Sequence, residues 1–179
     1  IKNIKTKVVA ANSINWTRCM SQSVYFFWSF LKLRSSQEKI SFSIPSGNFG
    51  HAYSGWFAKK MGLPIHRLLI ATNRNDVLHK LLTKNLYAKG EVYETLAPSM
   101  DISVASNFER LLFNLFDDNP KEVESLMSSF PLIPIQLPDK ELQIMRNFFT
   151  SNSSSDADIT NQIRDTFLTN SIIVDPHSA

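Results

Sequence analysis

The sequence predicts an α/β protein in which helices flank a mostly parallel sheet. Three observations lead to this prediction. Strand-like and helix-like segments alternate along residues 6–85. The links between them are short, which favours parallel strands joined by crossover helices that cover both faces of the sheet. A turn with two glycines, residues 46–50, leads from one of these strands directly into the next helix.

The first half of the chain carries recognisable start and stop signals for each element. Ser13 is the predicted N-cap of the first helix, whose apolar residues recur at helical spacing. Pro45 ends the second strand, and Gly62 with Pro64 closes the helix that follows. Asn75 or Asp76 is expected near the start of the next helix, with Asn75 favoured as its cap. The predicted strands are residues 6–12, 40–45 and 66–73, and the predicted helices are residues 13–33, 52–61 and 75–85.

The second half is predicted to be mainly helical. Ser106 with Glu109 has the spacing of a capping box, and the polar residues 150–158 are expected to form a loop. A last helix and a short strand at residues 171–179 would follow. The sequence divides into an α/β part at residues 1–105, a helical insertion or extension at residues 106–149, and a loop, helix and strand at residues 150–179 that return to the first part. The predicted helices are residues 106–116, 119–130, 137–149 and 159–170.

Composition narrows the class of protein. The 19 basic and 16 acidic side chains are scattered over 179 residues, which disfavours a nucleic-acid partner. The longest apolar run, residues 24–31, is too short to span a membrane. The single cysteine, Cys19, excludes an internal disulfide, fits a reducing compartment such as the cytoplasm, and lies in an apolar run that predicts a buried, inert thiol. The four histidines and Cys19 lack the spacing of metal ligands, so no metal is expected.

The glycine-containing turn fits an anion site. The first N–H groups of a helix are unpaired, and its dipole favours negative charge. Gly47 and Gly50 could adopt positive φ and let a ligand approach, while Ser46 and Asn48 could donate hydrogen bonds. The alternative is that the glycines only make a tight turn. Nucleotide binding is disfavoured, because the turn lacks both the P-loop lysine and the three-glycine fingerprint.

Seven strings then identify a resemblance that covers nearly the whole chain. They are ANSINWTR (11–18), PSGNFG (45–50), AKKMGLPI (58–65), ATNRND (71–76), TLAPSMDI (95–102), SNFERLLF (106–113) and DPHSA (175–179). Together and in this order they resemble the threonine synthase and threonine synthase-like family. The resemblance implies a pyridoxal phosphate (PLP) enzyme of fold type II, similar to tryptophan synthase β, of which this chain would be an incomplete part.

The resemblance also assigns the turn. It implies that Ser46, Gly47, Asn48, Phe49 and Gly50 cradle the cofactor phosphate, with Phe49 packed beneath the loop. The family's Schiff-base lysine lies in a Phe-Lys-Asp motif before the matched segment, and the partner of its pyridine nitrogen lies after the Asp-Pro-His segment. No lysine of this chain has that context. We therefore expect no catalytic residue in this chain, and no catalysis by this chain alone.

The expected partner is a small phosphorylated amino acid. The family reaction eliminates phosphate from O-phosphohomoserine and adds water to give threonine, while some threonine synthase-like members release 2-oxobutyrate, ammonia and phosphate. The sequence leaves both products open, and it does not define the oligomeric state. Further candidates for substrate binding, from their places after strands or beside the loop, are Asn12, Ser13, Asn15, His51, Asn73 and His177.

Several of these candidates have a structural alternative. His51 stands where the family usually has aspartate or asparagine; it could strengthen anion binding when protonated or simply pack in the first helical turn. His177 could face the site or only shape a turn, and Ser13 could only cap its helix. Other hypotheses for the whole chain are a β-replacement enzyme of the same fold, a generic phosphate- or nucleotide-binding module, and a non-catalytic remnant.

Overall fold

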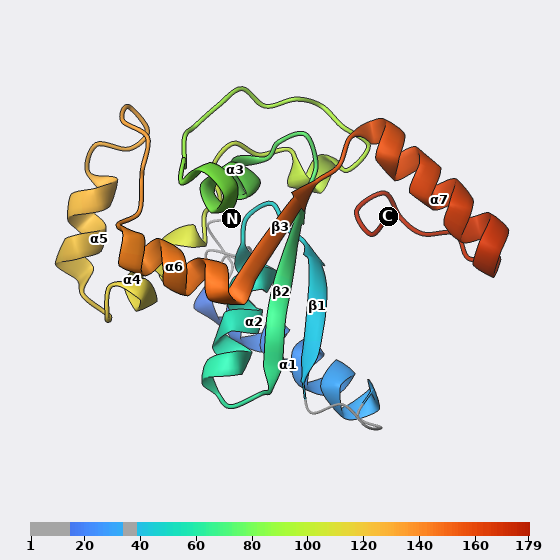
Figure 1. Ribbon diagram of the computed structural model, residues 1–179, viewed down its shortest axis with the longest axis horizontal. Coiled ribbons are helices and arrows are strands. Elements are labelled where there is room, and N and C mark those ends of the chain that lie inside the picture. The colour runs from blue at the N-terminus through green and yellow to red at the C-terminus, as the bar shows by residue number, and fades with distance from the viewer. Residues whose placement is uncertain (1–14, 34–38) are drawn as a thin grey trace, which may run out of the picture.

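The computed structural model describes residues 15–33 and 39–179, which form a three-stranded sheet with helices packed against it (Figure 1). The predicted strand at residues 6–12 and the candidates Asn12 and Ser13 lie outside the described residues. The elements are α1 (Trp16–Leu33), β1 (Ile40–Pro45), α2 (Gly50–Lys60), β2 (Ile65–Thr72), α3 (Val77–Lys84), a 3-10 turn η1 (Pro98–Met100), α4 (Phe108–Leu115), α5 (Pro120–Met127), α6 (Asp139–Phe148), β3 (Phe149–Ser153) and α7 (Asp156–Asn170).

The sheet is parallel throughout its described part, with the order β1-β2-β3. Ile70 at its centre pairs with Ile44 of β1 on one side and with Ser151 of β3 on the other. Parallel pairing brings the carboxyl ends of all three strands to one edge, where open α/β sheets hold ligands. The predicted α/β class with a mostly parallel sheet is confirmed.

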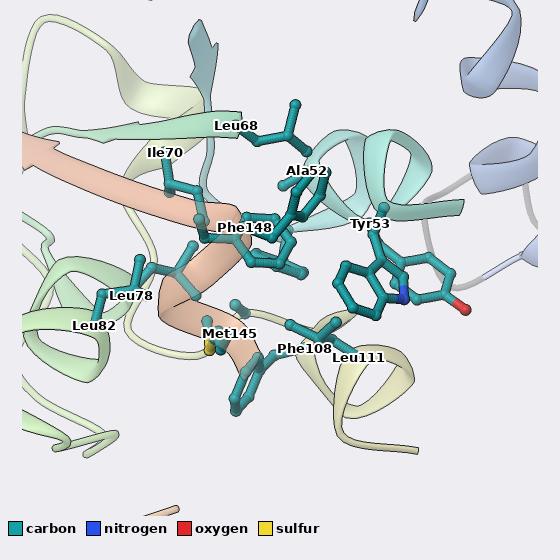
Figure 2. Packing of buried hydrophobic residues seen from close by; sticks show 14 of the residues in the cluster. Ala52, Tyr53, Leu68, Ile70, Leu78, Leu82, Phe108, Leu111, Met145 and Phe148 are labelled. Carbon is teal, nitrogen blue, oxygen red and sulfur yellow. The ribbon is translucent and has the colours of Figure 1, made fainter. Parts of the chain in front are cut away.

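The core lies on one side of the sheet. Leu68 and Ile70 of β2 are fully buried and meet Ala52 of α2 and Phe148 of α6, as Figure 2 shows. The alternate residue Leu69, on the opposite face of β2, is only half-buried. Since each buried aliphatic or aromatic side chain stabilises the fold by about 1.5–3 kcal/mol, this cluster holds the helices to the sheet.

Gly55 is required because α2 packs closely against both α1 and β2 at this residue. A Cβ atom at this position would lie 2.6 Å from Leu68 Cδ1 and 2.9 Å from Phe26 Cζ. We expect Gly55→Ala to lower the free energy of unfolding by about 1 kcal/mol, because overpacking costs about 1–3 kcal/mol and the gain in helix propensity returns about 1. Urea unfolding measures this, with Gly90→Ala as the control, since a Cβ at Gly90 meets nothing within 4 Å. Equal stability of both variants would contradict the close packing.

Two predictions about the C-terminal part are wrong. Residues 150–158 were expected to be a loop, yet Phe149–Ser153 form β3 and pair with β2 from Leu68 to Thr72. The segment is polar, so it lacks the β-branched pattern of a strand, and only its pairing partner makes it one. Residues 171–179 were expected to contain a strand but pair with no strand in the described part of the chain, where Ile173 is 79% exposed.

The helix ends also differ from the sequence prediction. The capping box does not form, because α4 begins at Phe108 after Asn107, and the Ser106 hydroxyl is turned to another segment. Asn75 does not cap α3; the N-cap is Asp76, and Asn75 binds a distant loop. The first helix begins at Trp16, and the Thr17 N–H donates to Asn15 Oδ1; the predicted cap Ser13 lies outside the described residues. At α3 and α4 a long-range contact or a shifted start displaces the local motif.

The predicted end of α2 at Gly62 and the predicted burial of Cys19 are confirmed. Gly62 has φ 100° directly after α2, as expected for a glycine that ends a helix. Asn119 caps α5 and accepts a hydrogen bond from the Lys121 N–H, with Pro120 at the first helical position. Cys19 is buried on the side of α1 that faces α2. None of the helices in residues 15–33 and 39–179 is long and apolar enough to cross a membrane.

Candidate functional site

The loop between β1 and α2 places residues 46–50 at the carboxyl edge of the sheet. The Ser46 N–H donates to the Ala71 carbonyl at 2.9 Å, which continues the strand pairing up to the loop. The chain then turns at Phe49, which has φ 62° and directly precedes α2. We expected the glycines to take the positive φ; instead Phe49 does. This strained backbone is offset by burial of the Phe49 ring, which is 1% exposed and packs against Phe108 and Phe149.

The loop offers a row of free donors. The backbone N–H groups from Gly47 to His51 have no acceptor among the described residues, and no side chain caps the helix at Phe49. They stand at the N-terminus of an 11-residue helix, where the dipole favours negative charge. This backbone fits a phosphate group, which accepts several hydrogen bonds at once.

Gly47 is needed for a close approach to the segment that precedes α4. A Cβ atom there would lie 3.1 Å from Met100 Cα and 3.3 Å from the Ser99 carbonyl oxygen. The turn η1 therefore forms one wall beside the loop. Its position depends on two other residues of the predicted site, Asn73 and His177.

Asn73 lies just beyond β2 and is 2% exposed. Its amide Nδ2 donates to Asp101 Oδ1 at 2.7 Å and to Thr95 Oγ1 at 2.7 Å. Asn75 Nδ2 reaches the same Asp101 oxygen at 3.0 Å, and Thr95 N donates to Oδ2 at 2.9 Å. Burial alone would raise the pKa of Asp101, but the hydrogen bonds from Thr95, Asn73 and Asn75 outweigh it and hold the pKa below its usual value. In this structure Asn73 organises the segment around η1.

His177 connects the Asp-Pro-His segment to the same turn. Its Nε2 accepts the Ser99 N–H at 3.2 Å, and its Nδ1 lies 2.7 Å from Asp175 Oδ1. Because a carboxylate only accepts and an amide N–H only donates, the ring proton lies on Nδ1. Because the carbonyl oxygen of the same Ser99 lies beside Gly47, His177 supports the wall of the loop.

The ring of His51, in the first turn of α2, lies against α1. Its ring stacks on Phe26 with centroids 4.7 Å apart and approaches Tyr25 edge-on. Burial lowers the pKa of His51, so the ring is uncharged at pH 7. This placement favours packing over anion binding for His51. Asn15 lies directly before α1, and its Oδ1 accepts a hydrogen bond from the Thr17 N–H. This contact favours a structural role for Asn15 at the start of the helix.

Two contacts of the loop with the segment before α4 were not predicted from the sequence. Ser106 Oγ donates to Asn48 Oδ1 at 3.2 Å, and the N–H of Asn107 donates to the Asn48 carbonyl at 3.0 Å. The only signal was the string SNFER, which local reasoning assigned to helix capping. The contact spans more than fifty residues and depends on how α4 packs on α2.

Tyr87 anchors the segment that makes these contacts. Its hydroxyl accepts the Ala105 N–H at 2.8 Å, inside a cluster with Phe108 and Phe130. Burial of the ring raises the pKa of Tyr87 to about 12. The position of residues 105–107 is thus fixed by a buried phenol.

We expect the Tyr87 hydroxyl to lose its proton only near pH 12, and the stability of the fold to decrease as it does so. A raised pKa means that the protonated phenol stabilises the fold fully below about pH 10, the ordinary tyrosine value, and that this is lost as pH rises through about 12. Tyrosinate absorbance should show a step near pH 12 that is absent in Tyr87→Phe and retained in Tyr25→Phe, which removes an exposed ring. If Tyr87→Phe kept the late step, the assignment would be wrong.

A groove of about 1020 Å³ lies outside the loop. It is lined by residues of α1, α2, α4 and α5, among them Trp16, Tyr53 and Arg110, and by none of residues 46–50. Within residues 15–33 and 39–179, no group of three or more metal-ligating side chains is close enough to hold an ion. The free backbone donors of residues 47–51 lie outside this groove.

Comparison with known proteins places the chain in a family. It is 42% identical to threonine synthase of Pseudomonas aeruginosa over 175 residues, 97% of this chain and 37% of that protein. The chain belongs to the threonine synthase family. Threonine synthase-like 2 of Homo sapiens is 32% identical over 182 residues, 98% of this chain and 37% of that protein. No family model matches the chain.

The fold agrees with solved threonine synthase structures. The PLP-bound threonine synthase from Brucella melitensis superposes with a TM-score of 0.91 at 38% sequence identity, covering 95% of this chain and 37% of that one. The three parallel strands and their flanking helices thus match those of threonine synthase structures. The chain spans about 37% of the length of these relatives.

Proposed function

We propose that residues 46–50 hold the phosphate of PLP in a complete protein that acts on O-phosphohomoserine. The observation that carries this is the row of N–H groups from Gly47 to His51 at the start of α2, none of which has an acceptor among the described residues. Ser46 precedes this row and Asn48 lies within it. The same loop belongs to a family whose Brucella melitensis member has been solved with PLP bound.

The residues of this chain would contribute binding and orientation. Backbone donors of the loop hold the phosphate, the buried Phe49 ring keeps the loop on the core, and η1 closes one side next to Gly47. PLP, when bound, supplies an electron sink for carbanions during loss of the substrate phosphate. The Schiff-base lysine would be supplied from elsewhere in the complete protein.

Threonine is the favoured product. Identity to the threonine synthase of Pseudomonas aeruginosa, 42%, exceeds that to the human threonine synthase-like 2, 32%, at nearly the same coverage of this chain. The higher identity supports the synthase over a phospho-lyase that yields 2-oxobutyrate and ammonia.

The test is to supply O-phosphohomoserine to the complete protein loaded with PLP and to identify the products. We expect threonine and phosphate in equal amounts. Release of 2-oxobutyrate with ammonia and phosphate would establish the phospho-lyase instead. A protein that bound PLP but released no phosphate would contradict both reactions.

A further inference from the structure

Two adjacent side chains just before α4 hold the loop at Asn48; we call Ser106 and Asn107 the Asn48 clamp. The Asn48 carbonyl oxygen accepts two hydrogen bonds from Asn107, from the backbone N at 3.0 Å and from Nδ2 at 3.1 Å. Ser106 Oγ donates to Asn48 Oδ1 at 3.2 Å. Both oxygen atoms of Asn48 are therefore engaged by the clamp.

This arrangement has an electrostatic consequence for an anion at the loop. A carbonyl oxygen turned toward a phosphate would repel it, whereas N–H groups attract it. With its two oxygens bonded to the clamp, Asn48 keeps its backbone N–H and its Nδ2 group, neither of which has an acceptor among the described residues. The clamp thus selects the orientation in which Asn48 presents only donors.

Asn107 is itself fixed from two further elements. It is 0% exposed, and its Oδ1 accepts hydrogen bonds from Arg110 Nε at 3.0 Å and from Cys19 Sγ at 3.5 Å. Because a guanidinium can only donate, the oxygen of the Asn107 amide must face Arg110, and its nitrogen must face Asn48. The orientation of the clamp is determined by this contact.

We propose that Ser106 and Asn107 are positioning residues for the cofactor phosphate, acting through Asn48. The inference rests on the proposed function, because it concerns the same loop. It adds a specific requirement. The part of the PLP affinity that comes from the phosphate group depends on two side chains that lie outside the loop.

The first test replaces the donor of the clamp by an acceptor of the same shape. Asn107→Asp keeps a partner for Arg110 but sets a carboxylate oxygen opposite the Asn48 carbonyl, which should turn the loop away. We expect PLP to bind about tenfold more weakly to the complete protein in an absorbance titration. Asn114→Asp is the matched control: it is the same substitution on the same helix, and Asn114 contacts Tyr53 and Asp118 rather than the loop. It should bind PLP like the wild type.

The second readout separates positioning from a general loss of structure. Pyridoxal lacks the phosphate but has the same ring, so general damage would weaken PLP and pyridoxal equally. The clamp predicts that Asn107→Asp weakens PLP alone. If the wild type preferred PLP to pyridoxal and Asn107→Asp kept this preference, the clamp would be overturned while the loop assignment stood. If the wild type showed no preference, the loop assignment would fail and the clamp with it.

A third variant covers the case in which Asn107→Asp does not fold. Ser106 is exposed, and its hydroxyl hydrogen bond to the loop goes to Asn48 Oδ1. Ser106→Ala should therefore fold like the wild type and bind PLP about threefold more weakly, since the Asn48 side chain loses its fixed orientation. Unchanged affinity for PLP in Ser106→Ala would overturn the role of the clamp.

Discussion

Gly47→Val is expected to weaken PLP binding by the complete protein about 100-fold. A Cβ atom at this position would already lie 3.1 Å from Met100 Cα, a backbone atom that can yield only if η1 moves. Valine adds two more carbon atoms, and overpacking of this kind costs about 1–3 kcal/mol. The loop can escape only by shifting, which removes its N–H groups from the phosphate. An absorbance titration with PLP measures the loss, at about tenfold per 1.4 kcal/mol.

Gly90→Val is the matched control for this prediction. A Cβ atom at Gly90 meets nothing within 4 Å, and the residue is exposed in the segment between α3 and η1. This variant should bind PLP like the wild type. If Gly47→Val bound PLP as tightly as Gly90→Val, residues 46–50 would not be the phosphate site.

Local patterns predicted much of the fold but not all of it. The strands Ile40–Pro45 and Ile65–Thr72 are rich in apolar and β-branched residues, and their character is visible without any partner. Phe149–Ser153 has no such character and becomes a strand because Leu68–Thr72 lies open beside it. The sequence does not show which polar segment returns to the sheet edge, so this strand was missed.

The site was predicted in its position but not in its construction. The string around Gly47 and the family resemblance identified the loop. The residue with positive φ, however, is Phe49, and Gly47 is needed because the backbone of η1 lies close to it. The bonds from Asn107 to Asn48 and from Asn73 to Asp101 join segments separated by 59 and 28 residues. Capping rules consider only nearby residues, and therefore they assigned Ser106 and Asn75 to helix ends that they do not cap.

Asp101→Ala is expected to cause the largest loss of stability, about 2–3 kcal/mol in the free energy of unfolding. The Asp101 carboxylate accepts hydrogen bonds from the Thr95 N–H, the Thr95 hydroxyl, Asn73 Nδ2 and Asn75 Nδ2. Its removal leaves the Thr95 N–H and hydroxyl without their acceptor, while Asn73 Nδ2 keeps Thr95 Oγ1 and Asn75 Nδ2 keeps the Tyr93 carbonyl. Each unsatisfied buried group costs about 1–3 kcal/mol before relaxation. Urea unfolding measures the change. Asp165→Ala, at an exposed ion pair with Arg164, should cost less than about 0.5 kcal/mol.

The same variant should show a defined pH dependence. The pKa of Asp101 is lower in the folded protein than the value of about 3.9 for a free aspartate, so its ionised form stabilises the fold above about pH 4. That contribution is lost as pH falls through the folded pKa. The stability gap between the wild type and Asp101→Ala should therefore be constant from neutral pH down to about 4 and narrow below it. A gap that stayed the same in acid would show that packing around Met100, rather than the ionised carboxylate, holds η1 against the loop.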